Sequence, residues 1–249
     1  MRLTTYIGLI MGVAVVITAV YAKGGDMRLF ANAVGLLIAV GGTTAATTLS
    51  SSRETAGQAF DALKRLFVTG IQPRKEITDA LMAIARQAKA GGLASLDADK
   101  LAPNDRYLHM GIQLVADGVE SERIEELMRL GSDTLSDVRS SAERMFRLMG
   151  TYSPMFGLVG TLIGLISMLK DLTDPRAIGQ GMSVALMATF YGVLLAGLIF
   201  LPMAGKVRTL DLDERMQRDQ MLAVLLAVRL GRSPEYVRET LQAFHKGPV

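Results

Sequence analysis

Long apolar stretches without a charged side chain occur four times along the sequence. They lie between Arg2 and Lys23, Arg28 and Arg53, Arg147 and Lys170, and Arg176 and Lys206. Each has 20 residues or more, and about 20 residues of helix cover a hydrocarbon core of roughly 30 Å. The pattern predicts an all-α membrane protein with four transmembrane helices, at about 3–22, 29–49, 152–169 and 180–203.

The rest of the sequence predicts soluble helices. We expect residues 1–52 to hold transmembrane helices 1 and 2, and 150–205 to hold helices 3 and 4. A helical domain, 53–149, is inserted between helices 2 and 3, and a helical tail follows at 206–249. In these soluble parts, apolar residues recur at steps of three or four, as on one face of a helix. No segment shows the alternation that is typical of a strand.

Helix boundaries follow from the apolar stripes and from capping residues. The first predicted soluble helix lies between Thr55 and Thr69. The second begins at Pro73 and ends at Gly91, with an apolar stripe of Ile77, Leu81, Ile84 and Ala88. A third runs from Asn104 or Asp105 to Gly118, and a fourth runs from Ser121 into the third span with a bend near 150–154. The fourth span is expected to extend past Pro202 to Leu230, and a last helix runs from Ser233 and Pro234 to Phe244.

Basic residues indicate how the chain is oriented in the membrane. The segment 53–149 holds 14 Lys and Arg and the tail from Lys206 holds eight, whereas the connections after spans one and three are short. Arg53, Arg144, Arg147, Lys206 and Arg208 lie close to span ends. By the positive-inside rule, both termini and 53–149 are cytoplasmic. The pattern thus predicts a multi-pass membrane protein.

Composition and motifs argue against an enzyme. The sequence has no Cys and two His, so disulfides, thiolate sites and a structural zinc site are not expected. No phosphate-binding loop, nucleophile elbow or zinc-protease motif occurs. We therefore expect no catalytic residue, cofactor, nucleic-acid partner or permanently bound metal.

Small and hydroxyl-bearing residues form one face in each of the last two spans. On the third span these are Gly157, Gly160, Thr161 and Gly164, and on the fourth they are Ala185, Ala188, Thr189, Gly192 and Ala196. One interpretation is close helix packing alone. The other is an ion pathway that includes Gly160, Thr161, Gly164, Ala185 and Thr189. Because the spans are neutral, the counter-charge for a cation must then come from another polypeptide.

Two other features have an ordinary and a functional interpretation. Pro154 and Pro202 lie near span ends and remove helical donors; they are either tolerated prolines or hinges for conformational coupling. Charged residues surround the Gly91-Gly92 break, where they form either a solvated turn or a contact surface: Arg86, Lys89, Asp97, Asp99 and Lys100.

Several motifs together resemble the flagellar stator subunits of the MotA/PomA family, within the wider MotA/TolQ/ExbB superfamily. The most specific motifs are the segments Phe156 to Leu165, Asp174 to Gly179 and Met182 to Gly192. Earlier segments agree too, whereas span one matches weakly: these segments are Val40 to Gly42, Lys89 to Asp97, Gly111 with Ile112, and Asp117 with Gly118. The order of these motifs is consistent over nearly the whole chain.

The resemblance implies a ring of five subunits around two copies of a single-span partner, MotB or PomB, whose membrane helix carries the ion-binding Asp. It also implies that ion flow drives torque on the rotor protein FliG, through the charged residues named above. Lys89 and Asp97 are similar in charge to the family's rotor-facing residues, although Lys and Asp replace Arg and Glu.

The same resemblance favours Na⁺ as the transported ion. Thr189 resembles a threonine found in both proton-driven and sodium-driven stators, whereas Thr161 resembles one typical of the sodium-driven PomA type. We expect transient Na⁺ near Thr161 and Thr189, with H⁺ as the alternative. The rival function is an ExbB/TolQ-like energiser of envelope transport, which the two N-terminal spans argue against.

Overall fold

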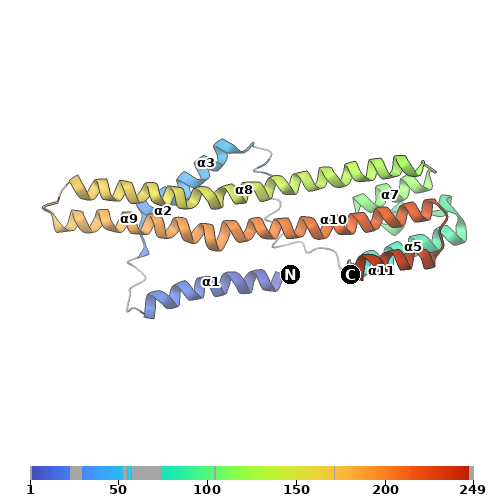
Figure 1. Ribbon diagram of the computed structural model, residues 1–249, viewed down its shortest axis with the longest axis horizontal. Helices are drawn as coiled ribbons and strands as arrows, with labels where there is room; N and C mark the ends of the chain where they lie inside the picture. Colours follow the sequence, from blue (N-terminus) through green and yellow to red (C-terminus); the bar gives the residue numbers. More distant parts are fainter. Residues whose placement is uncertain are drawn as a thin grey trace. The chain divides into compact units, whose positions relative to one another are not determined.

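The computed structural model describes residues 2–22, 30–52, 55, 57, 74–103, 105–170 and 172–246. Within these ranges every regular element is a helix (Figure 1), which confirms the all-α prediction. The chain divides into two compact units. The first unit comprises Met1–Gly70 and Val138–Arg208, and the second comprises Ile71–Asp137 and Thr209–Val249.

The first unit contains the apolar helices. Its elements are α1 (Arg2–Ala22), α2 (Ala33–Leu36), the π-helical turn η2 (Leu37–Gly41), α3 (Gly42–Ser50), the second part of α8 (Ser121–Lys170), α9 (Pro175–Leu195), the π-helical turn η4 (Ala196–Phe200) and the start of α10 (Leu201–Arg229). Asp174 caps α9 by accepting a hydrogen bond from the Arg176 amide at 2.9 Å, and Pro175 fills the first helical position.

Three helical stretches in the described residues are long and apolar enough to cross a membrane. They are Ala33–Ser50, Ser121–Lys170 and Pro175–Arg229. Tyr6–Ala22 is apolar but shorter. Three of the four predicted spans thus meet this criterion, and the count of four stays a prediction.

The second unit has an ordinary apolar core. Its elements are α5 (Arg74–Gly91), the 3-10 turn η3 (Leu93–Ser95), α6 (Ala98–Leu101), α7 (Arg106–Ala116), the first part of α8, the second part of α10 and α11 (Pro234–Lys246). Residues from all the longer helices are fully buried there, among them Leu81, Ile84, Ile112, Ile124, Met128, Leu225 and Val237.

Most predicted helix ends in the second unit are confirmed. Gly92, with φ +75°, follows the last residue of α5. Asp105 caps α7 by accepting from the amides of Tyr107 and Leu108, both at 3.0 Å. Ser233 Oγ accepts from the Tyr236 amide at 3.3 Å at the start of α11. The helix predicted between Thr55 and Thr69 lies, apart from two residues, outside the described residues.

In the first part of α8, apolar residues recur at helical spacing through Leu135 and Val138, which predicts that both side chains face inward. This prediction is wrong. Leu135 and Val138 are 44% and 38% exposed, whereas Ser132 and Ser136 are only 5% and 6% exposed. The two serines are buried because both accept hydrogen bonds from Arg218 of α10, at 2.9 Å each. A polar contact, and not a hydrophobic one, therefore faces inward at this level of the helix.

Candidate functional site

Helices α8 and α9 approach each other through glycines, and they lie side by side in the first unit (Figure 1). A Cβ atom on Gly164 would lie 2.5 Å from the Gly181 carbonyl oxygen, and one on Gly192 would lie 2.5 Å from the Ser153 carbonyl oxygen. Such distances leave no room for a side chain, so the two backbones touch. We call this contact the α8–α9 interface.

Two threonine hydroxyls meet in the α8–α9 interface. Thr161 Oγ1 and Thr189 Oγ1 are hydrogen-bonded to each other. Thr161 Oγ1 also lies 3.2 Å from the carbonyl oxygens of Gly157 and Ala185, and Thr189 Oγ1 lies 3.2 Å from that of Gly157. Both threonines are half-buried. The interface therefore gathers four oxygen atoms in a charge-free part of the chain.

The hydrogen-bond arithmetic leaves the hydroxyl oxygens able to accept. Each threonine has one O–H donor and two lone pairs. The two hydroxyls can therefore make two of these hydrogen bonds at a time: Thr161 donates to Thr189 while Thr189 donates to the Gly157 carbonyl. In that arrangement Thr161 keeps two free lone pairs and Thr189 keeps one, and these are available to a cation. Neither hydroxyl can neutralise it, because the surrounding stretches 148–169 and 177–205 hold no carboxylate.

Atoms of the neighbouring helices occupy the space beside the other small residues that were proposed for the ion pathway. Gly160 is packed so closely that a Cβ there would lie 2.3 Å from the Ala188 Cβ atom. Gly164 is buried against Gly181 and Ala185, and the Ala185 side chain is 3% exposed. The structure thus brings Gly160, Gly164 and Ala185 to the same interface as the threonines, where they let the two backbones approach.

The two prolines lie in different helical environments. Pro154 is inside α8, which continues as one helix from Ser121 to Lys170, so the bend predicted there does not interrupt it. Pro202 is exposed and follows the π turn η4. In that turn the Leu201 amide donates to the Ala196 carbonyl, five residues earlier. Pro202 has no backbone N–H to donate, and it directly follows a turn in which the backbone hydrogen bond already spans five residues instead of four.

Sequence reasoning missed three polar residues of the first unit. Ser153 is fully buried and donates to the Gly192 carbonyl at 3.0 Å, across the α8–α9 interface. Asn32 and Tyr191 are hydrogen-bonded to each other although 159 residues separate them. Ser153 had a detectable signal, since it lies four and eight residues before Gly157 and Thr161 on one helix face.

The charges proposed for the rotor contact lie in the second unit. Arg86, Lys89, Asp99 and Lys100 are exposed, and Asp97 is half-buried as the cap of α6. Three of them form two local pairs. Asp97 Oδ2 lies 2.9 Å from Lys100 Nζ, and Asp99 Oδ1 lies 3.0 Å from His109 Nε2.

In the Asp97–Lys100 pair, each group shifts the pKa of the other so that its charged form is favoured. The hydrogen bond from the Lys100 ammonium lowers the pKa of Asp97, and the Asp97 carboxylate raises the pKa of Lys100. Both groups are therefore charged at neutral pH. The pair is solvent-exposed, so it adds charge to this surface and little to stability.

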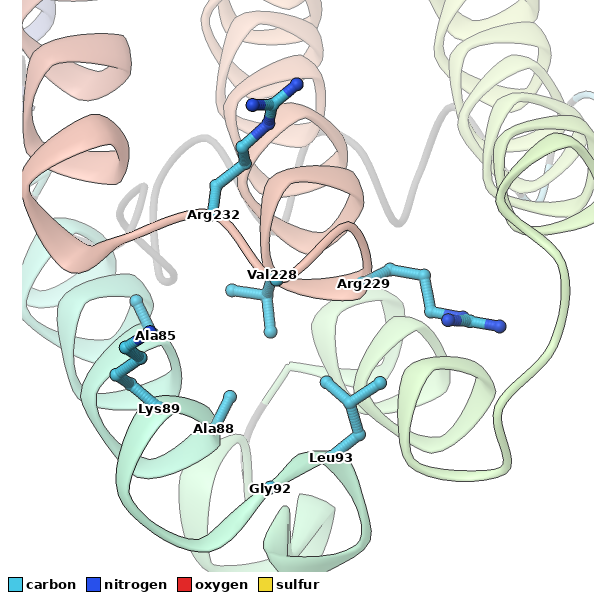
Figure 2. Close-up of a pocket in the computed structure, with 9 residues that line it drawn as sticks. Ala85, Ala88, Lys89, Gly92, Leu93, Val228, Arg229 and Arg232 are labelled. Atoms are coloured by element: carbon cyan, nitrogen blue, oxygen red, sulfur yellow. The ribbon is translucent and has the colours of Figure 1, made fainter.

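Lys89 and Arg86 line separate hollows of the second unit. The hollow beside Lys89 has a volume of about 270 Å³ and includes Val228, Arg229 and Arg232. Figure 2 shows Ala88, Leu93 and Val228 turned toward it, whereas the guanidinium groups of Arg229 and Arg232 extend away. Arg229 donates to the carbonyls of Val119 and Gly118 at 2.7 and 2.8 Å. The second hollow, beside Arg86, also includes Asp79 and Arg238.

Within the described residues, no cluster of three or more His, Asp or Glu side chains could hold a metal ion. The oxygen atoms at Thr161 and Thr189 are neutral hydroxyls and carbonyls.

Helical stretches that are long and apolar enough to cross a membrane are typical of an integral membrane protein. Residues 99–220 match the MotA/TolQ/ExbB proton channel family. The chain is 30% identical over 247 residues to "Chemotaxis protein PomA" of Vibrio alginolyticus, covering 98% of this chain and 95% of that protein. The chain belongs to the MotA/TolQ/ExbB family.

Solved structures agree in fold. The structure of C. jejuni MotAB covers 100% of this chain and 98% of the matched chain, with a TM-score of 0.92 at 24% identity. The flagellar MotAB stator complex from Bacillus subtilis covers 96% and 94%, with a TM-score of 0.88 at 25% identity. The helical architecture described above is therefore that of the stator subunits.

Proposed function

We propose that this chain is the ion-conducting stator subunit of a bacterial flagellar motor, and that it couples inward ion flow to torque on the rotor. Its likeness to PomA over almost its full length supports this function, as does its likeness to a flagellar stator complex. The observation that carries the ion pathway is the contact between Thr161 and Thr189 in a charge-free interface.

The partner is a MotB- or PomB-type subunit with a single span. The neutral spans provide hydroxyl ligands but no counter-charge, so a carboxylate must be supplied by a second polypeptide. The solved relatives are MotAB complexes, which supports such a partner. We further propose five copies of this chain around the partner, with FliG contacted through Arg86, Lys89, Asp97, Asp99 and Lys100.

The proposed topology has four spans in the bacterial inner membrane. Both termini and the domain 53–149 face the cytoplasm, where the Lys and Arg near the span ends favour them. Pro154 and Pro202 are proposed to couple ion occupancy to movement of the cytoplasmic helices, because each removes a backbone donor at the end of a span.

The proposed ion is Na⁺, with H⁺ as the alternative. A bare Na⁺ ion needs several oxygen ligands to replace its water, and two adjacent hydroxyls with two carbonyls provide them. A proton needs only one acceptor, so the second hydroxyl would be dispensable. Swimming speed measured at varied external Na⁺ decides between them: a speed independent of Na⁺ would establish H⁺.

The function is tested by Thr189→Val, which keeps the shape of the side chain and removes its hydroxyl. Swimming should stop while the amount of the chain in the membrane stays unchanged. The matched control is Thr44→Val, because Thr44 is an exposed span threonine that bonds only to carbonyls of its own helix. Normal swimming of the Thr189→Val strain would overturn the ion pathway.

Ion flux in liposomes gives a second test. The purified chain alone should conduct neither Na⁺ nor H⁺, and flux should appear when a partner with a membrane carboxylate is added. Robust cation flux through this chain unaided would contradict the division of roles between neutral ligands and the partner's charge.

A further inference from the structure

A polar network ties the start of α2 to α9 in the first unit. The Asn32 amide N–H donates to the Tyr191 hydroxyl at 3.0 Å, and that hydroxyl donates to the Phe30 carbonyl. Asn32 Nδ2 donates to Ser183 Oγ at 3.1 Å, while Asn32 Oδ1 accepts from the Gly35 amide at 2.9 Å and caps α2. One tyrosine hydroxyl therefore holds two backbone groups of the segment that leads into α2.

The same helix is pressed against the residue next to Thr189. A Cβ atom on Gly35 would lie 3.0 Å from the Ala188 backbone nitrogen. Ala188 is fully buried, and it is covered on another side by Gly160 of α8. Ala188, the residue that precedes Thr189 in α9, is thus packed between α2 and α8.

The π turn η2 follows α2 directly. Its residue Ile38 lies beside the α8–α9 interface, since its Cγ2 atom is 3.3 Å from the position of a Cβ on Gly160. A π turn is rare and less favourable than an α-helical one, so surrounding contacts must hold it. The Asn32–Tyr191 network is one such contact, at the N-terminal end of the same helix.

An interfacial tyrosine is the ordinary explanation for Tyr191. Tyrosines near a membrane surface usually direct the hydroxyl to water and headgroups. The Tyr191 hydroxyl instead accepts from one backbone group and donates to another, and its side chain is half-buried. The rings of Phe30 and Phe190, with centroids 5.5 Å apart, pack beside it. These contacts fit a role in fastening two helices.

We propose that Tyr191 is a positioning residue: it fastens α2 to α9 and thereby sets the orientation of Thr189 toward Thr161. This inference rests on the proposed ion pathway and adds a residue that determines the affinity of the ion site without touching the ion. When the fastening is lost, Ala188 gains freedom to shift, and the four oxygen atoms around the two threonines separate.

The test is Tyr191→Phe in cells that carry the complete motor, with speed measured against the external concentration of the driving ion. We expect the half-saturating concentration to rise on the order of tenfold, because the variant loses both hydrogen bonds of the Tyr191 hydroxyl and each contributes a factor of about 2 to 10. The speed at saturation and the amount of the chain in the membrane should stay near wild type. An unchanged half-saturating concentration would overturn the proposal.

Two further variants guard against a folding artefact. Tyr152→Phe is the matched control and should change nothing, because the Tyr152 hydroxyl makes no hydrogen bond to any part of the chain that the structure describes. Ser183→Ala removes only the second link to Asn32 and should give a smaller shift in the same direction. If both network variants lower the amount of protein and leave the half-saturating concentration unchanged, the role of Tyr191 is structural only.

Failure of this inference is distinguishable from failure of the proposed function. If Thr189→Val swims normally, the ion pathway is wrong whatever Tyr191 does. If Thr189→Val stops motility and Tyr191→Phe has wild-type ion dependence, the pathway stands and the positioning role is wrong.

Discussion

The Arg218 guanidinium donates to the Ser132 hydroxyl at 2.9 Å, although Arg218 is only 5% exposed. It also donates to Ser136, and the Asp211 and Glu214 carboxylates of its own helix lie 3.7 Å away. A buried charge of this kind is stable only while its partners remain. This contact fixes how the described parts of α8 and α10 pair in the second unit.

Arg218→Met should destabilise the second unit strongly. The change leaves Asp211 and Glu214 without their buried counter-charge, and breaking a buried ion pair costs about 3–5 kcal/mol. Thermal unfolding of the purified chain in detergent measures the effect. Arg215→Met is the matched control: its pair with Asp133 is exposed and should contribute no more than about 1 kcal/mol. Equal losses in the two variants would contradict the structural role of Arg218.

Gly164→Ala should disrupt the α8–α9 interface. The added Cβ would lie 2.5 Å from the Gly181 carbonyl oxygen and 2.6 Å from the Ala185 nitrogen, and both are backbone atoms that cannot rotate aside. We expect a loss of about 1–3 kcal/mol or more in stability, together with loss of motility. Gly179→Ala, on the facing helix α9, would place its Cβ where no atom lies within 4 Å and should be tolerated. Similar behaviour of both variants would show that the helices do not touch here.

Tyr107 should be a late-titrating tyrosine. Burial raises the pKa of Tyr107 from 10.0 to about 12, although the nearby Arg218 charge opposes this. Because the folded pKa exceeds the unfolded one, its contribution to stability is complete below pH 10 and is lost as the pH rises toward 12. Phenolate absorbance during an alkaline titration measures this, and Tyr107→Phe should remove that component. Tyr236→Phe, at an exposed tyrosine, should leave the component in place. A Tyr107 that ionises near 10 would contradict its burial.

Local signals predicted the helix ends, whereas long-range contacts were beyond their reach. Asp105, Gly92 and Ser233 are recognisable because a cap acts within three residues of its own position. Arg218 lies in a tail rich in charge, where a solvated position is the natural expectation, and only the fold shows Ser132 opposite it.

In the candidate site too, the sequence predicted the local features and not the long-range contacts. The stepwise spacing of Thr161 and Thr189 placed each on a helix face, and their neutral surroundings were evident from composition. Their mutual hydrogen bond depends on glycines of both helices meeting at once. The π turn Leu37–Gly41 adds one residue to a turn, which periodicity at 3.6 residues does not register.

Thr161→Ala and Thr161→Ser together test whether the second hydroxyl is an ion ligand. Thr161→Ala removes an oxygen that lies beside Thr189 and within 3.2 Å of two carbonyls, so a Na⁺ ion loses one ligand and its hydration is less well replaced. We expect the half-saturating Na⁺ concentration for swimming to rise on the order of tenfold, since about 1.4 kcal/mol of lost coordination is a factor of ten. Thr161→Ser keeps the hydroxyl and should stay near wild type. Thr48→Ala, at an exposed threonine bonded only to its own helix, is the control for general damage. If Thr161→Ala and Thr161→Ser have the same Na⁺ dependence, the Thr161 hydroxyl packs helices and does not bind the ion.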